Sequence, residues 1–119
     1  MEFKELEEKV LEWADIHDLL HEENSDKQFL KFVEEVFEFK TEMDSKGSRW
    51  DNGDNYSDII EDLMLEMGDV FVTLIILCKQ LGIEPQRCLE LAYKKIKDRK
   101  GETRNGMFYK AEDLPGKVE

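Results

Sequence analysis

Two acidic segments in this chain have the side chains and the spacing to bind a divalent cation. The first, EEVFE, spans residues 34–38, and the second, EMGD, spans residues 66–69. Residues three or four apart lie above one another on one face of a helix, so each segment presents a pair of carboxylates. Two facing helices would bring four oxygen donors together, and such a set suits Mg²⁺ or Mn²⁺. The four carboxylates are Glu35, Glu38, Glu66 and Asp69.

A solvated helix face is the alternative interpretation of acidic residues at helical spacing. Here the carboxylates alternate with apolar residues such as Phe37 and Val70, and neither segment has a well-placed lysine four residues further on. Lys31, four residues before Glu35, leaves partial ion pairing open. Like charges on facing helices repel unless a cation joins them, and these features favour a metal site.

Charge is distributed unevenly along the chain. The 119 residues carry a net charge of −12, yet residues 94–110 hold seven basic and only two acidic side chains. An acidic body disfavours nucleic acid, so we expect no nucleic-acid partner. The basic segment suits a small anion such as a phosphate ester; alternatively, it satisfies the dipole at the end of its own helix.

The composition predicts a soluble, cytoplasmic protein with no membrane partner. The N-terminus is charged and has no apolar signal region. The longest apolar run, residues 70–78, is shorter than the roughly 20 residues of a membrane span. Cys78 and Cys88 form no CxxC pair and fit no zinc module, so we expect thiols in a reducing compartment, with a disulfide as the alternative.

Apolar residues recur at helical spacing along nearly the whole chain, which predicts an all-α, four-helix bundle-like fold in a single domain spanning residues 1–119. Ser25 and Ser57 are the predicted N-caps, and Gly82 is the predicted left-handed residue after the third helix. A loop is expected at 47–55. The helices are predicted at about residues 3–21, 26–45, 58–81 and 85–99, followed by an irregular C-terminal tail at 100–119.

The apolar run at residues 70–78 is consistent with a buried strand on propensity alone. It continues without a breaker from residues 66–69 to Gly82, however, and this favours a helix. A helix that is apolar on nearly all sides needs cover all round, which four helices of one chain supply poorly. We therefore expect self-association to a dimer or tetramer.

The two acidic segments, in this order, resemble the EExxE and ExxD signature of the MazG-like all-α nucleoside triphosphate pyrophosphohydrolases. Gln28 and Lys31 precede the first segment as in many members of that family. Residues 93–101 resemble its late Lys/Arg helix end, and residues 105–110 are similar to small phage-type members. The likeness covers roughly residues 10–110.

The resemblance implies a MazG-type fold and Mg²⁺-dependent hydrolysis of (deoxy)nucleoside triphosphates to a nucleoside monophosphate and pyrophosphate, with Mn²⁺ as a substitute ion. It implies a role in nucleotide-pool cleaning. The catalytic group would be Glu34, Glu35 and Glu38, and the metal ligands Glu35, Glu38, Glu66 and Asp69. Glu34 would be a further ligand, an outer-shell carboxylate or the base that orients the attacking water. The phosphate-binding residues would be Lys31, Lys95 and Arg99.

The chain departs from the family at Ala92, where many relatives carry asparagine three residues before the lysine matched by Lys95. The contact that this asparagine makes is therefore absent here or is supplied by another residue, such as Tyr93 or a residue of the tail. Trp13 and His17 have a spacing similar to that of pyrimidine-handling relatives, and with Gln28 they are the candidates for base binding. The alternative is that Trp13 and His17 belong to the apolar stripe by which the first helix packs into the core, and in that case they would not bind a base.

Two further functions are consistent with the sequence. A non-catalytic acidic interaction protein would spread its carboxylates over an exposed face and would not respond thermally to Mg²⁺. A narrow-specificity relative, hydrolysing dUTP, dCTP or phosphoribosyl-ATP, would keep the fold and the metal site.

Overall fold

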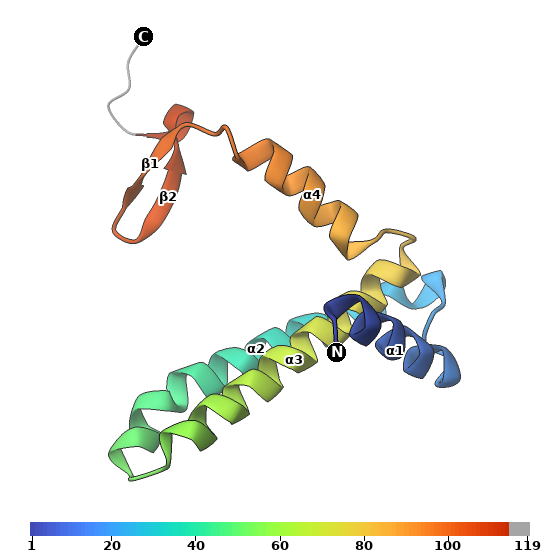
Figure 1. Ribbon diagram of the computed structural model, residues 1–119, viewed down its shortest axis with the longest axis horizontal. Coiled ribbons are helices and arrows are strands. Elements are labelled where there is room, and N and C mark those ends of the chain that lie inside the picture. Colours follow the sequence, from blue (N-terminus) through green and yellow to red (C-terminus); the bar gives the residue numbers. More distant parts are fainter. Residues whose placement is uncertain (115–119) are drawn as a thin grey trace. The chain divides into compact units, whose positions relative to one another are not determined.

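The computed structural model describes residues 1–114 and is mostly helical, with one small two-stranded sheet. The helices are α1 (Phe3–Ile16), α2 (Ser25–Asp51), α3 (Tyr56–Gln80) and α4 (Pro85–Ile96), with short 3-10 turns η1 (Glu22–Asn24) and η2 (Ala111–Asp113) (Figure 1). The strands are β1 (Gly101–Arg104) and β2 (Met107–Lys110). The prediction of a predominantly helical chain is confirmed.

The chain forms two compact units, one from Met1 to Glu84 and one that begins at Pro85. The prediction of one domain over the whole chain stays a prediction. Among the described residues, no helix has both the length and the apolar character that crossing a bilayer requires.

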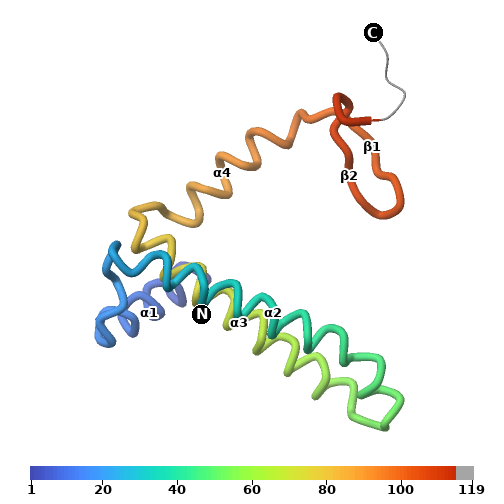
Figure 2. The backbone as a smooth tube through the Cα atoms, turned by 180° about the vertical axis from the view of Figure 1, so that it is seen from behind, coloured from blue at the N-terminus to red at the C-terminus, as the bar shows by residue number. Residues whose placement is uncertain are grey.

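The first unit is built on an antiparallel helix pair formed by α2 and α3, which lie side by side along their length (Figures 1 and 2). The buried apolar side chains come mainly from α3, including Ile59, Ile75 and Ile76. Gln28 on α2 donates from its amide nitrogen to the carbonyl oxygen of Thr73 on α3, at 3.2 Å. This bond joins the two helices near the start of α2.

Helix α1 packs against the C-terminal half of α3. The rings of Phe3 and Phe71 meet edge to face with centroids 6.2 Å apart. Beyond α1, the carbonyl oxygen of Leu19 accepts a 2.7 Å hydrogen bond from the buried amide of Gln80. These contacts hold α1 and its following turn to the end of α3.

Helix α1 ends at Ile16, so its predicted extension to about residue 21 is wrong. Asp18 adopts a left-handed conformation with φ 59°. The amide of Leu19 then donates to the carbonyl of Ala14 at 2.9 Å, the closure that usually follows a C-terminal glycine. Gly82, with φ 71°, makes the same closure after α3 and confirms the predicted end of that helix.

Helix α2 runs to Asp51 and therefore includes part of the predicted loop at 47–55. Gly47 lies inside the helix, and the chain turns only at Gly53, with φ 86°. Helix α3 is capped by the side chain of Asn55, which accepts from the amide of Ser57 at 2.8 Å, so the predicted cap at Ser57 is wrong. Helix α2 begins at Ser25 itself and its N-cap residue is Asn24, so the predicted N-cap at Ser25 is also wrong.

In the second unit, α4 ends at Ile96, before the predicted end at about residue 99. The predicted irregular tail is wrong for residues 101–110, which form an antiparallel β1–β2 hairpin (Figure 2). Asn105 and Gly106 at its turn both have positive φ, 52° and 78°, as a type I′ turn requires. The part of the predicted tail beyond Leu114 lies outside the described residues.

Candidate metal centre

Three carboxylates from two helices converge near the middle of the α2–α3 pair. Glu35 and Glu38 on α2 and Glu66 on α3 each offer one oxygen, and these oxygens lie within 4.8 Å of one another. A Mg²⁺ ion with ligands at 2.0–2.1 Å holds its oxygens about 3–4 Å apart. Small side-chain rotations would therefore bring the three oxygens to the distances that one ion requires. These three residues form the carboxylate cluster.

The carboxylate cluster contains two oxygen atoms that lack a partner. Glu35 is only 8% exposed. Among the described residues, the Oε2 atoms of Glu35 and Glu66 are both shielded from solvent without a hydrogen bond. Such an acceptor costs about 1–3 kcal/mol, and more when charged. A cation at this position would satisfy both atoms, and the all-oxygen donor set fits a hard ion such as Mg²⁺.

Lys31 lies beside the carboxylate cluster. Its Nζ is 3.2 Å from Oε1 of Glu35 and 3.7 Å from Oε2 of Glu34. The hydrogen bond to Glu35 and the charge of Glu34 raise the pKa of Lys31. Since Lys31 contacts Oε1 of Glu35, the other oxygen of that carboxylate stays available. Glu34 is exposed and is not part of the cluster.

Crowding of negative charge raises the pKa of two members of the carboxylate cluster. The hydrogen bond that a protonated Glu38 makes with Glu35, together with the charge of Glu35, raises the pKa of Glu38. Burial raises the pKa of Glu66, and the charges of Asp69 and Glu35 raise it further. Both shifts mean that the ionised cluster is unfavourable without a compensating positive charge.

Asp69, the fourth predicted ligand, is exposed one turn beyond Glu66 and does not belong to the carboxylate cluster. Its charge still contributes to the raised pKa of Glu66. The structure thus brings three of the four predicted ligands together, and the ligand role of Asp69 stays a prediction.

Acidic residues one turn outside the carboxylate cluster have a basic partner. Arg49 donates to Oε1 of Glu42 at 2.8 Å and to Oδ2 of Asp62 at 2.9 Å, and it also pairs with Asp54 at 2.8 Å. Sequence analysis missed Arg49 because it falls in the segment predicted as a loop. Arg49 thus neutralises acidic residues outside the cluster, whereas Glu35, through Lys31, is the one cluster residue with a basic partner in the described structure.

The second unit carries the basic residues predicted to bind phosphate. Lys95 and Arg99 line a cavity of about 340 Å³, to which Lys100 and Lys110 also contribute. Sequence analysis did not single out Lys110 as a site residue, although the Asn105–Gly106 turn that folds it back is a strong hairpin signal. A phosphate role for Lys95 and Arg99 stays a prediction.

The candidates for base binding lie in two places. The Trp13 and His17 rings are 4.5 Å apart, and Nδ1 of His17 hydrogen-bonds to the carbonyl oxygen of Trp13 at 2.8 Å. Both side chains are exposed in the described structure. The amide nitrogen of Gln28 is engaged with Thr73 between α2 and α3. Their base-binding role stays a prediction.

The fold and the carboxylate cluster define a helical protein with a candidate divalent-cation site between two antiparallel helices. Comparison of the chain with protein-family models, curated proteins and solved structures finds no match. The resemblance to MazG-like enzymes therefore depends on sequence motifs, and function is argued from the geometry of the cluster.

Proposed function

We propose that the protein is a Mg²⁺-dependent nucleoside triphosphate pyrophosphohydrolase with a MazG-type fold, acting in cytoplasmic nucleotide-pool cleaning. The observation that carries this proposal is the convergence of Glu35, Glu38 and Glu66, with two shielded oxygens that lack a partner. The resemblance of residues 34–38 and 66–69 to the family signature supports the reaction class.

In the proposed reaction, water attacks the α-phosphorus and the bond from that phosphorus to the bridging oxygen breaks. Pyrophosphate leaves with the electron pair, and the proton of the water passes to a carboxylate. Bound Mg²⁺ would supply charge neutralisation at the phosphate oxygens. Glu35, Glu38 and Glu66 would hold the ion through their carboxylate oxygens, with Asp69 as the fourth ligand.

Other residues near the carboxylate cluster fit the remaining roles. Glu34 is exposed next to Lys31, where its carboxylate can accept a proton from water or serve as a further or outer-shell ligand. Lys31 carries a half-exposed ammonium that can hold a phosphate oxygen. Lys95 and Arg99 would bind the leaving pyrophosphate.

Pyrophosphate release from a panel of standard and modified (d)NTPs, with Mg²⁺ or with EDTA, tests the proposal. We expect release only with a divalent ion, reduced at least about 100-fold in Glu38→Gln and Glu66→Gln. Glu61→Gln is the matched control, because it removes a charge from an exposed position of α3 outside the carboxylate cluster. Release that persists in EDTA or in both cluster variants would overturn the proposal. Activity on dUTP, dCTP or phosphoribosyl-ATP alone would identify a narrow-specificity enzyme.

Self-association is part of the proposal. Phe37 is 66% exposed on α2 and Leu65 is 62% exposed on α3, while few large apolar side chains are buried. Surfaces that carry many exposed apolar side chains, as these two helices do, are typical of interfaces that another subunit covers. A dimer or tetramer in sedimentation velocity is the expected result.

The same exposed apolar residues favour, as a second candidate, a non-catalytic interaction protein. Such a protein would bind a partner through these surfaces and would release no pyrophosphate from any substrate of the panel. Its melting temperature would not change on addition of Mg²⁺, whereas the proposed enzyme is stabilised by the ion.

A further inference from the structure

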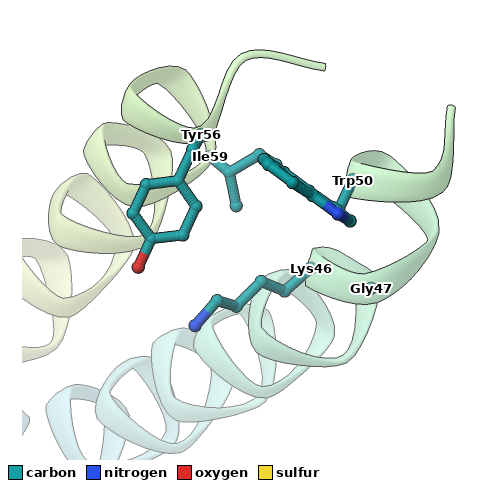
Figure 3. A pocket seen from close by; sticks show the side chains of 5 residues that line it. All are labelled: Lys46, Gly47, Trp50, Tyr56 and Ile59. Carbon is teal, nitrogen blue, oxygen red and sulfur yellow. The ribbon is translucent and has the colours of Figure 1, made fainter. Parts of the chain in front are cut away.

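A second candidate binding site lies at the turn end of the α2–α3 pair. Five residues line a pocket of about 370 Å³, at the small end of the roughly 300–1,000 Å³ range of ligand sites: Lys46, Gly47, Trp50, Tyr56 and Ile59. Figure 3 shows the Trp50 and Tyr56 rings on two sides of the hollow, with the Ile59 side chain between them and the Lys46 side chain along one edge. The pocket belongs entirely to the first unit.

The aromatic pair is shaped to receive a third ring. The centroids of Trp50 and Tyr56 are 6.1 Å apart and the ring planes are nearly perpendicular, at 88°. A planar ligand can therefore stack on one face while its edge meets the other ring. Ile59, only 2% exposed, provides a fixed apolar wall, and Gly47 has no side chain to fill the space.

Lys46 gives the pocket a positive charge. The side chain is half-buried, and no ion pair or hydrogen bond joins it to another residue of the described chain. This is unusual in a chain of net charge −12, where the nearby Arg49 contacts three carboxylates. Packing of Trp50 against Tyr56 at the turn between α2 and α3 is a sufficient structural reason for these two rings. It does not account for an ammonium group beside them that has no partner among the described residues.

The pocket is distinct from the carboxylate cluster. Glu38 and Lys46 are eight residues apart on α2, which corresponds to about 12 Å along the helix axis. None of the three residues of the carboxylate cluster lines the pocket, so the two sites use different side chains.

We propose that the Lys46–Trp50–Tyr56 pocket binds a planar aromatic ring that carries an anionic group, in the size class of a nucleoside monophosphate. The ring stacks against Trp50 and Tyr56, and the anion pairs with the ammonium of Lys46. This site is additional to the proposed hydrolytic centre and does not depend on it.

The fluorescence of Trp50 tests the proposal directly. The chain has two tryptophans, so a Trp13→Phe background leaves Trp50 as the reporter. The probes are AMP, adenosine and inorganic phosphate, each titrated in EDTA so that no divalent ion binds the carboxylate cluster. We expect saturable quenching by AMP, about tenfold weaker affinity for adenosine, and no response to phosphate.

Variants in the same background separate the contributions. Lys46→Gln is expected to weaken AMP binding about tenfold and to remove the difference between AMP and adenosine. Tyr56→Leu should weaken both ligands about tenfold. The Lys27→Gln variant, which changes an exposed lysine of the same helix outside both sites, should bind AMP as the parent does.

Three outcomes would overturn the proposal. The first is the absence of saturable quenching by AMP. The second is equal affinity for AMP and adenosine in the parent, because Lys46 would then contribute nothing. The third is a Trp50 signal that depends on protein concentration and not on AMP, which would show that a second copy of the chain covers the pocket.

Discussion

Replacing Glu35 by glutamine is expected to stabilise the metal-free protein, although the change breaks an ion pair. The Oε2 atom of Glu35 is shielded and has no hydrogen-bond partner among the described residues, and such an acceptor costs about 1–3 kcal/mol. Glutamine keeps the side-chain shape and offers an amide N–H to the neighbouring carboxylates. The lost pair with Lys31, at 3.2 Å and with the lysine end half exposed, contributes about 0.3–0.5 kcal/mol.

The difference predicts a gain of about 0.5–2.5 kcal/mol in the free energy of unfolding. For a chain of this length this corresponds to roughly 2–15 °C in melting temperature. Thermal unfolding followed by circular dichroism in EDTA measures it directly. With Mg²⁺ at 100 times its dissociation constant, wild type gains about 2.7 kcal/mol, whereas Glu35→Gln gains little, so the order of stability reverses.

Glu61→Gln again serves as the control, and its free energy of unfolding should stay within about 0.5 kcal/mol of wild type in either condition. If Glu35→Gln melts below wild type in EDTA while the control is unchanged, the Glu35 carboxylate already has a compensating partner, and the reasoning is refuted. A Mg²⁺ response of equal size in both proteins would place the ion elsewhere.

Three other perturbations give clear expectations. The hydrogen bond to Asp18 raises the pKa of His21 above 6.5. The stability that this bond contributes is therefore complete below pH 6.5 and is lost as the pH rises through the pKa of the folded state. An NMR titration should show the raised pKa of His21 in wild type and its return toward 6.5 in Asp18→Asn. Gly101→Ala would place its Cβ 2.0 Å from a carbonyl oxygen of β2, so hydrogen exchange should show loss of protection in the hairpin, while Gly47→Ala, with open space around the new methyl group, should stabilise α2 by about 1 kcal/mol. Leu65→Lys places a charge on an exposed apolar position of α3, so sedimentation velocity should show a smaller assembly, and an unchanged mass would remove this position from the interface.

The parts of the structure that sequence predicts well depend on apolar periodicity. The pattern places the start of α2 and both ends of α3 to within two residues, and the one-turn spacing within residues 34–38 and 66–69 anticipates that carboxylates of two helices approach each other. Periodicity reports which residues share a face, but not whether each side chain turns inward. This is why Glu66 joins the carboxylate cluster and Asp69, on the same helix, lies exposed outside it.

Helix ends were harder to predict, because backbone conformation at single residues decides them. Asp18 takes the left-handed conformation that glycine usually adopts, and nothing in its neighbourhood announces this. The predicted loop begins at Gly47, yet Gly47 lies inside α2, because a glycine in a helix costs only about 1 kcal/mol, which other interactions of the helix outweigh. The Asn105–Gly106 turn, in contrast, was a readable hairpin signal beside short strands of four residues each.

Arg49 stabilises the α2–α3 helix pair at one end only. Its guanidinium pairs with Glu42 of α2 and Asp62 of α3 near the turn between these helices. Contacts of α1 with α3 stabilise the opposite end. The ligand positions between these two supports are consequently free to vary without separating the helices. Substitutions there, for example histidine at Glu38, offer a route to a different ion preference on an unchanged scaffold.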